Sequence, residues 1–252
     1  VWNPQTDAKL ATPFDVEALE ARKANKAALQ QRLGLPERPN APLLAMVTRL
    51  DWQKGVDIIG HPLNLLLNGG AGEAQVVIVG SGSAEAEAML RGFQSEHPDR
   101  MRAVLTYAPE LAPLVYGGSD IFLMPSLFEP CGLGQMIALR YGTIPVVRET
   151  GGLADTVRDY EPATGAGNGF SFGEYDSMAL YTALIRALET YRHQDTWSQL
   201  MQHAMTADHS WHSSARRYTE LYGRALANRL TQAAQAPYSR DAATSYREDQ
   251  GS

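Results

Sequence analysis

The chain has 252 residues, of which 44% are hydrophobic, and this length allows one ordinary core with extensions but no second catalytic domain. A net charge of -6 without any basic patch or polybasic run argues against a nucleic-acid or membrane surface. One cysteine excludes an internal disulfide framework, and neither a signal-like start nor a bilayer-length apolar run is present. We therefore expect a cytoplasmic protein, or one of the plastid stroma after processing.

The first half of the chain alternates helices and strands. Asp15 predicts the cap of a helix that runs to about Leu33, where Gly34 stops it. A linker leads to a strand over 43–47, and a helix follows Gly55. The next expected elements are a strand over 75–79, the turn Gly80-Ser81-Gly82, a helix from Ser83 and a strand over 102–106. This alternation is typical of a parallel sheet.

The second half continues the alternation and then becomes helical. Strands are expected over 121–125 and 143–147, and a helix over 135–141 lies between them. Three helices follow without strands, over 176–192, 195–206 and 211–228. The last helix carries apolar residues at helical spacing, which by default pack: Trp211, Ala215, Tyr218 and Tyr222.

The predicted fold class is therefore α/β, a doubly wound, Rossmann-like parallel sheet with C-terminal helices. We expect this domain to span residues 1–228. Residues 229–252 lack periodicity and are rich in polar and small side chains, so we expect a disordered tail there.

The run from Pro125 to Gln135 is the most informative stretch, because it joins a strand to a helix. Glu129 follows the carboxyl end of that strand, where open α/β sheets bind ligands. The glycines allow close approach to the backbone, and a helix N-terminus offers unpaired N–H groups. These features predict a site for an anionic or polyhydroxylated ligand. The alternative is a tight turn in which Glu129 only caps the helix.

Two cations follow the first strand. Arg49 and Lys54 can both reach the carboxyl edge of the sheet, where a diphosphate would meet two positive charges. The alternative is an ordinary solvated loop. Gly80-Ser81-Gly82 lacks the full dinucleotide fingerprint, and we expect a turn that approaches a ligand or a neighbouring loop. Thr150-Gly151-Gly152 supplies a second amide-lined turn at the same edge.

Four segments together resemble the bacterial glycogen synthases and plant starch synthases, which transfer glucose from a nucleotide sugar. They are Trp2-Asn3-Pro4 with Thr6-Asp7, Thr48 to Gly55, Glu129 to Leu133, and Tyr141 to Val157. The resemblance covers nearly all of residues 1–225. It implies the C-terminal nucleotide-sugar-binding domain of a two-domain GT-B glycosyltransferase. Because the chain opens within a motif, we expect an excised domain without the acceptor-side N-terminal domain.

The resemblance also implies roles for individual residues. Arg49 and Lys54 would hold the phosphates and stabilise the leaving group, and Tyr107 would stack on adenine. Glu129 would accept a hydrogen bond from a hydroxyl of the transferred glucose. Two loops would bind the nucleotide sugar through their backbone. The residues of these loops are Cys131, Gly132, Leu133 and Gly134 in one, and Thr150, Gly151 and Gly152 in the other.

The sequence departs from related transferases at a few positions. Ile137 stands where many related sugar transferases carry a second glutamate, and Leu127 and Gly134 replace a common arginine and threonine. Cys131 has no histidine near it in sequence, so we expect a small buried loop residue rather than a nucleophile. His203, His209 and His212 form no familiar metal spacing, and no metal or organic cofactor is implied.

The activity implied for the parent enzyme is transfer of glucose from ADP-glucose to the nonreducing end of an α-1,4-glucan, with retention of configuration and release of ADP. Residue chemistry alone does not separate ADP-glucose from UDP-glucose. Two alternatives stay open. The chain can be a nucleotide-binding module with no activity of its own, or belong to another sugar-nucleotide enzyme such as an epimerase.

Overall fold

The computed structural model describes residues 2–69 and 73–235. The chain divides into two compact units, residues 1–207 and residues 208–252. The first unit contains the sheet and all the residues predicted for the site, and the second contains one long helix.

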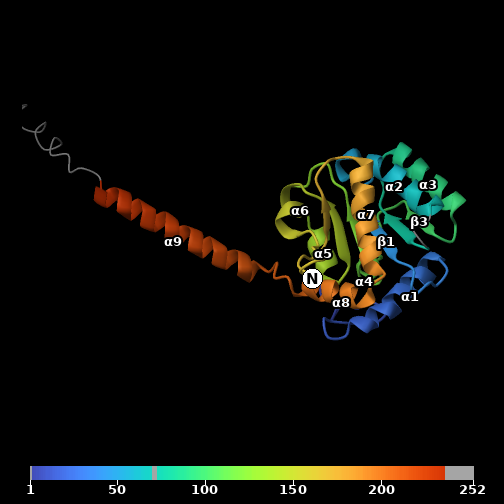
Figure 1. The fold of residues 1–252 in the computed structure, drawn as a ribbon, viewed down its shortest axis with the longest axis horizontal. Helices are drawn as coiled ribbons and strands as arrows, with labels where there is room; N and C mark the ends of the chain where they lie inside the picture. Colours follow the sequence, from blue (N-terminus) through green and yellow to red (C-terminus); the bar gives the residue numbers. More distant parts are fainter. Residues whose placement is uncertain (1, 70–72, 236–252) are drawn as a thin grey trace, which may run out of the picture. The chain divides into compact units, whose positions relative to one another are not determined.

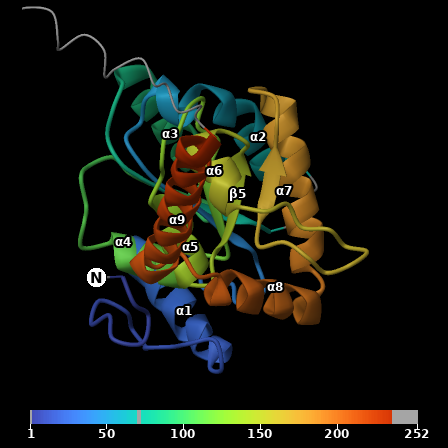
Figure 2. The same ribbon diagram turned by 90° about the vertical axis from the view of Figure 1, so that its left-hand side faces the viewer.

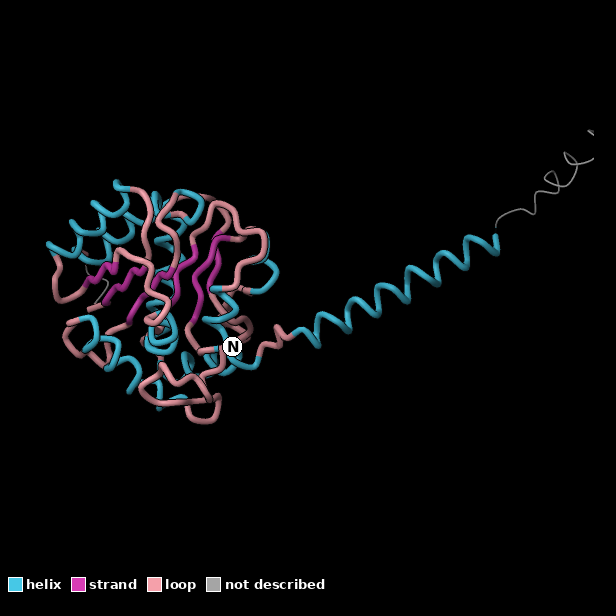
Figure 3. Tube along the Cα trace, turned by 180° about the vertical axis from the view of Figure 1, so that it is seen from behind, coloured by secondary structure: helices cyan, strands magenta, loops and turns pink. Residues whose placement is uncertain are grey.

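Within the described residues, six parallel strands form one sheet in the order β3-β2-β1-β4-β5-β6. They are β1 (Leu43–Val47), β2 (Gln75–Val79), β3 (Met101–Val104), β4 (Ile121–Met124), β5 (Ile144–Arg148) and β6 (Phe170–Phe172). The strand order reverses between β1 and β4, and helices flank the sheet on both faces (Figure 3). The predicted doubly wound fold is therefore confirmed. Open sheets of this kind bind ligands outside the carboxyl ends of the strands, at the point of reversal.

Helices connect the strands. The helices of the first unit are α1 (Arg22–Leu33), α2 (Val56–Asn68), α3 (Ala84–Glu96), α4 (Ala112–Gly118), α5 (Gly134–Arg140), α6 (Gly151–Thr156), α7 (Ser177–Tyr191) and α8 (Gln194–Thr206). Short 3-10 turns, η1 (Leu19–Ala21) and η2 (Trp52–Lys54), precede α1 and α2. In both ribbon views α1 and α8 lie together at one end of the sheet (Figures 1 and 2).

The side chains of each strand alternate between two cores. Leu44 and Met46 of β1 lie in a core with residues of α2 and α7, whereas Leu43 and Ala45 lie in a second core with residues of α1 and α4. All four are essentially buried. Because both faces of the sheet are covered, strands such as β1 and β4 are continuous apolar runs rather than alternating polar and apolar residues.

A buried ion pair joins the two halves of the sheet at the amino ends of the strands. Lys26 Nζ lies 2.6 Å from Asp120 Oδ2, and the same carboxylate oxygen accepts a 2.8 Å hydrogen bond from Leu43 N. Asp120 stands just before β4, and Leu43 begins β1. Lys26 and Asp120 are 6% and 8% exposed, so either charge without the other would be buried unpaired.

Some predicted boundaries were wrong. Asp15 accepts hydrogen bonds from Glu17 N and Ala18 N, but α1 begins only at Arg22, after a separate 3-10 turn. Its end at Gly34, with φ of 64°, is as predicted. Strand β6 was not predicted, because its three residues are too few to show a period.

The second unit contains helix α9 (Trp211–Gln235), which continues beyond the predicted end at 228 into the expected tail. The rest of that tail, residues 236–252, lies outside the described residues. Trp211, Tyr218 and Tyr222 are exposed, although packing was expected for them. Across 2–69 and 73–235, no helix combines the length and apolar character needed to cross a lipid bilayer.

Candidate functional site

Three loops meet at the carboxyl edge of the sheet. The first follows β1 and contains the η2 turn, which Asp51 caps by accepting a 3.2 Å hydrogen bond from Lys54 N. The second, residues 125–133, follows β4 and leads into α5. The third follows β5 and leads into α6 at Gly151. These loops carry most of the residues that the sequence predicted.

Lys54 and Glu129 form the centre of this edge. Lys54 Nζ lies 2.6 Å from Glu129 Oε2, and Ser126 Oγ donates a 3.2 Å hydrogen bond to the same oxygen. The two side chains are 23% and 10% exposed. Glu129 caps no helix: α5 is preceded by Leu133, and no side chain caps its first turn. The turn-capping alternative for Glu129 was therefore wrong.

The second and third loops pack backbone against backbone. A Cβ at Gly151 would lie 2.1 Å from Glu129 O, and one at Gly152 would lie 1.8 Å from Cys131 O. Gly132 and Gly151 also have positive φ, 70° and 46°. Gly152 N donates a 3.0 Å hydrogen bond to Glu129 O, so this N–H is already used. The glycines therefore set the spacing between the loops, a role that the sequence analysis did not foresee for Gly152.

A row of backbone donors stands beside Glu129. Among the described residues, the N–H groups of Cys131, Gly132 and Leu133 donate to no partner. The side chains of Cys131 and Leu133 are exposed. The expected burial of Cys131 was wrong, because this loop faces outward from the sheet edge. Three successive unpaired donors next to a carboxylate can bind a ligand that carries several hydroxyl groups.

A cavity of about 370 Å³ extends this edge toward β2 and β3. Its lining includes Trp2, Arg49, Ser81 and Tyr107, together with other residues that follow β1, β2 and β3. Arg49 is 70% exposed and its guanidinium lies 3.0 Å from the Asp51 carboxylate, and Tyr107 is 84% exposed. An aromatic ring and a cation at the mouth of an apolar cavity suit a planar base that carries phosphates.

The glycine turn after β2 approaches a neighbouring loop, as predicted. A Cβ at Gly80 would lie 1.7 Å from Thr48 O, and one at Gly82 would lie 2.0 Å from Leu50 O. The turn thereby holds the start of the first loop, from which Arg49 projects.

Other residues that support the site were missed by the sequence analysis. Arg148 donates a 3.1 Å hydrogen bond to Leu127 O and lies over the ring of Tyr175, with Cζ 5.6 Å from the ring centroid. Tyr175 in turn donates to Asp57 at 2.6 Å, and burial together with this bond raises the pKa of its hydroxyl well above the ordinary value. Only the position of Arg148 directly after the strand expected over 143–147 could have suggested this contact.

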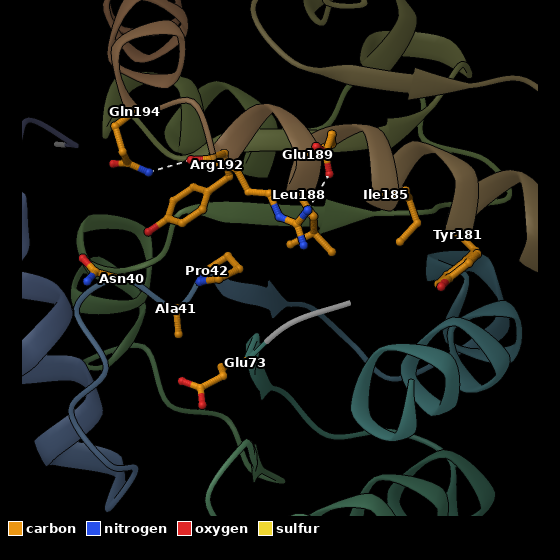
Figure 4. A pocket seen from close by; sticks show the side chains of 11 residues that line it. Asn40, Ala41, Pro42, Glu73, Tyr181, Ile185, Leu188, Glu189, Arg192 and Gln194 are labelled. Atoms are coloured by element: carbon orange, nitrogen blue, oxygen red, sulfur yellow. Dashed lines mark hydrogen bonds and ion pairs between the residues drawn. The ribbon is translucent and has the colours of Figure 1, made fainter. Parts of the chain in front are cut away.

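A larger cavity of about 660 Å³ lies at the opposite end of the sheet, beside the amino ends of β1 and β2 (Figure 4). Asn40, Pro42 and Glu73 line it on one side, and residues of α7 and its C-terminal end line the other. None of the residues predicted for the site belongs to it. Throughout the described ranges, no group of three or more His, Cys, Asp and Glu side chains could hold a metal ion. That the reaction needs no metal or cofactor stays a prediction.

Residues 28–202 match the family described as glycosyl transferases group 1. The chain belongs to this family. A glycogen synthase of Bacillus cereus (strain B4264) is 47% identical over 222 residues, which cover 88% of this chain and 46% of the relative. A glycogen synthase of Desulforudis audaxviator (strain MP104C) is 48% identical over 226 residues, 89% of this chain and 44% of the relative.

The same resemblance extends to solved glycosyltransferase structures. The catalytic domain of starch synthase IV from Arabidopsis thaliana, bound to ADP and acarbose, superposes with a TM-score of 0.78 at 39% identity. The match covers 90% of this chain and 47% of that one. The predicted resemblance to glycogen and starch synthases and the predicted GT-B-type fold are thus confirmed. This glycosyltransferase chain spans about half the length of the curated relatives that it matches.

Proposed function

We propose that this chain is the nucleotide-sugar-binding part of an ADP-glucose-dependent glycogen or starch synthase. The observation that carries the proposal is the Lys54–Glu129 contact beside the unpaired N–H groups of residues 131–133. At one edge of the sheet, this arrangement places the Lys54 cation, which can bind a phosphate, beside the Glu129 carboxylate, which can bind a sugar hydroxyl. The N–H groups of residues 131–133 can bind further hydroxyls. The similarity to glycogen synthases supports the same assignment.

In this proposal Tyr107 and the cavity beside it take the adenine, and Arg49 and Lys54 take the diphosphate. An ammonium group has three N–H donors, so Lys54 can keep its bond to Glu129 while it also binds a phosphate oxygen. Glu129 accepts a hydrogen bond from a glucose hydroxyl, and the N–H groups of residues 131–133 donate to neighbouring hydroxyls.

The chemical step in the proposal is front-face transfer with retention, through an oxocarbenium-like state. The bond from the anomeric carbon to the phosphate oxygen breaks, and its electron pair leaves with ADP. Lys54 and Arg49 stabilise the negative charge that develops on the departing phosphate, which makes electrostatic preorganisation the main catalytic device. The acceptor hydroxyl of the α-1,4-glucan forms the new bond on the same face of the sugar, and its O–H bond breaks as the proton passes to the departing phosphate oxygen of ADP.

The choice of ADP rests on the comparisons, because the related starch synthase structure is described as bound to ADP. The acceptor glucan and a second, acceptor-side domain are proposed partners, since the relatives are about twice as long as this chain. A cytoplasmic location is proposed from the bacterial glycogen synthases among these relatives. The half-length coverage also favours one alternative, a module that binds nucleotide but transfers no sugar alone. No observation favours the epimerase alternative.

Calorimetry of ADP binding tests the proposal on this chain. Charge-assisted hydrogen bonds contribute about 1.5–3 kcal/mol each, so Lys54→Ala should weaken ADP binding roughly 10- to 150-fold. Lys23→Ala is the matched control, because Lys23 is an exposed lysine of α1 whose one ion-pair partner among the described residues is Glu20. It should leave ADP affinity unchanged. Failure of the folded wild-type chain to bind ADP would refute the site.

A further inference from the structure

Gln135 is the second residue of α5 and is completely buried beneath the loop that carries the unpaired N–H groups. Its Nε2 donates to Cys131 O at 3.1 Å and to Gly132 O at 3.0 Å. The same nitrogen reaches Thr156 Oγ1 at 3.1 Å and Gly152 O at 3.4 Å. One amide group therefore contacts both the loop before α5 and helix α6.

The direction of this amide is set by its surroundings. The reverse orientation would place an oxygen against the carbonyl oxygens of Cys131, Gly132 and Gly152, so the nitrogen faces them. Gln135 Oε1 then lies beneath Gly132, where an added Cβ would come within 2.5 Å of it. In the part of the chain that the structure describes, this buried oxygen has no hydrogen-bond partner. A buried acceptor left unpaired costs stability, which suggests that the amide is kept for another reason.

Peptide geometry supplies that reason. In a planar trans peptide the C=O and the following N–H point in opposite directions, and the described chain contains no cis peptide. The Cys131 carbonyl shares its peptide with Gly132 N–H, and the Gly132 carbonyl shares its peptide with Leu133 N–H. Gln135 holds both carbonyls from the buried side, so both N–H groups are turned toward the open side of the loop.

We propose that Gln135 is a positioning residue that fixes the direction of the Gly132 and Leu133 N–H groups for a polyhydroxylated ligand. Thr156 supports this role, because its hydroxyl donates to Gly152 O at 2.6 Å and accepts from Gln135 Nε2. We call the side chains of Gln135 and Thr156 the clasp. The clasp thus ties these donors to α6, whose first turn also packs on the carbonyl of Glu129. The carboxylate and the amides are thereby held in one arrangement. That the ligand is a nucleotide sugar rests on the proposed function.

The decisive experiment compares substitutions in this chain by NMR relaxation. Gln135→Met keeps the length and burial of the side chain but removes its donor. A rigid backbone gives order parameters of about 0.85, and a mobile backbone gives values below about 0.6. We expect Gly132 and Leu133 to be rigid in the wild type and to become mobile in Gln135→Met. Thr156→Val should move them in the same direction, and Thr156→Ser, which keeps the hydroxyl, should restore the wild-type values.

Gln30→Met is the matched control. Gln30 is 1% exposed and donates to Gln75 Oε1 at 2.6 Å, at the amino end of β2, away from the site. It should lower the melting temperature by a similar amount but leave the order parameters of residues 132 and 133 unchanged. If Gln135→Met does not fold, the order parameters of Thr156→Val are compared with those of the wild type instead. Order parameters that stay at wild-type values in the folded clasp variants would overturn the proposal.

A second measurement separates this inference from the proposed function. In Gln135→Met, the Gly132 and Leu133 N–H groups should lose their hydrogen bonds to the sugar hydroxyls. Neutral hydrogen bonds contribute about 0.5–1.5 kcal/mol each, so the affinity for ADP-glucose should fall by at least about 5-fold, while the affinity for ADP stays unchanged. An equal loss for both ligands, or no loss for either, would contradict the role in sugar binding. If the wild-type chain bound neither ADP nor ADP-glucose, the proposed function would be refuted. If residues 132 and 133 were nevertheless mobile only in the clasp variants, the positioning role of Gln135 would still be supported.

Discussion

In the part of the chain that the structure describes, the Glu129 side chain has two partners, the Lys54 ammonium and the Ser126 hydroxyl, and both contact the same carboxylate oxygen. No described residue binds its other oxygen, which remains for a ligand hydroxyl. A substitution at Glu129 therefore has two separable effects. It removes an acceptor for the sugar, and it removes a negative charge next to the lysine that we assign to the phosphates.

We predict that Glu129→Gln lowers kcat by about 100-fold or more, a loss near 2.7 kcal/mol, in a two-domain enzyme that contains this chain. The carboxylate should matter most when the sugar flattens and gains positive charge in the transition state. ADP itself offers no such hydroxyl, so its affinity should not fall. Steady-state glucan elongation and ADP calorimetry on the same preparation measure both quantities.

Glu189→Gln is the control for this prediction. Glu189 belongs to α7 and pairs with Arg192 at 3.1 Å, beside the cavity at the end of the sheet opposite the proposed site. It should leave kcat near the wild-type value. Melting curves of both variants check that folding is intact. A near-normal kcat for a folded Glu129→Gln enzyme would defeat the catalytic assignment.

At the residue scale, the sequence predicted positions better than contacts. The order of strands and loops brought Arg49, Lys54 and Glu129 to one edge, because parallel strands end on the same side. It did not predict that Lys54 and Glu129 would touch each other. Gln135 was missed because a polar residue in a short helix resembles a solvated one until its buried partners are known.

At the element scale, the loops after β4 and β5 depend on glycine for their close approach. We predict that Gly152→Ala destabilises the protein by about 1–3 kcal/mol, the usual range for overpacking, because its Cβ would lie 1.8 Å from a backbone oxygen. Backbone atoms cannot rotate out of the way as a flexible side chain can. Chemical denaturation monitored by circular dichroism gives the free energy of unfolding.

Gly173→Ala provides the comparison, since a Cβ there would meet no atom within 4 Å. Its free energy of unfolding should change by no more than about 0.5 kcal/mol. Equal stability of the two variants would mean that the two loops do not pack as described.

Elements with a clear period were predicted well, and those defined by tertiary contacts were not. Five of the strands were expected. Four of them are largely buried and mostly apolar, whereas β3 contains Arg102 and is only partly buried. The strand Phe170–Phe172 is defined by its pairing with β5 and by the core contacts of its two phenylalanines, which no local pattern reveals. Asp15 forms the expected side-chain bonds to backbone N–H groups, yet the helix begins later, because a capping motif also suits an isolated turn.

At the scale of the whole molecule, binding and turnover should separate. We expect this chain alone to bind ADP but to elongate an α-1,4-glucan negligibly, because acceptor contacts and closure over the substrates would come from a second domain. Fusing the amino-terminal half of a glycogen synthase relative to this chain should restore transfer. Incorporation of labelled glucose into glycogen measures it. Full activity of the chain by itself would contradict the two-domain assignment.

The buried pair of Lys26 and Asp120 also affects when the protein can fold during its synthesis. The two residues are separated by 94 positions, so the ribosome makes the lysine long before its counter-charge. Until Asp120 emerges, docking of α1 against β1 would bury an ammonium without a carboxylate, at a cost of several kcal/mol. We therefore expect ribosome-bound chains that stop before Asp120 to remain open to protease, and resistance to appear only after β4 has emerged. The ion pair thus delays the first half of the sheet until the second half is available to close it.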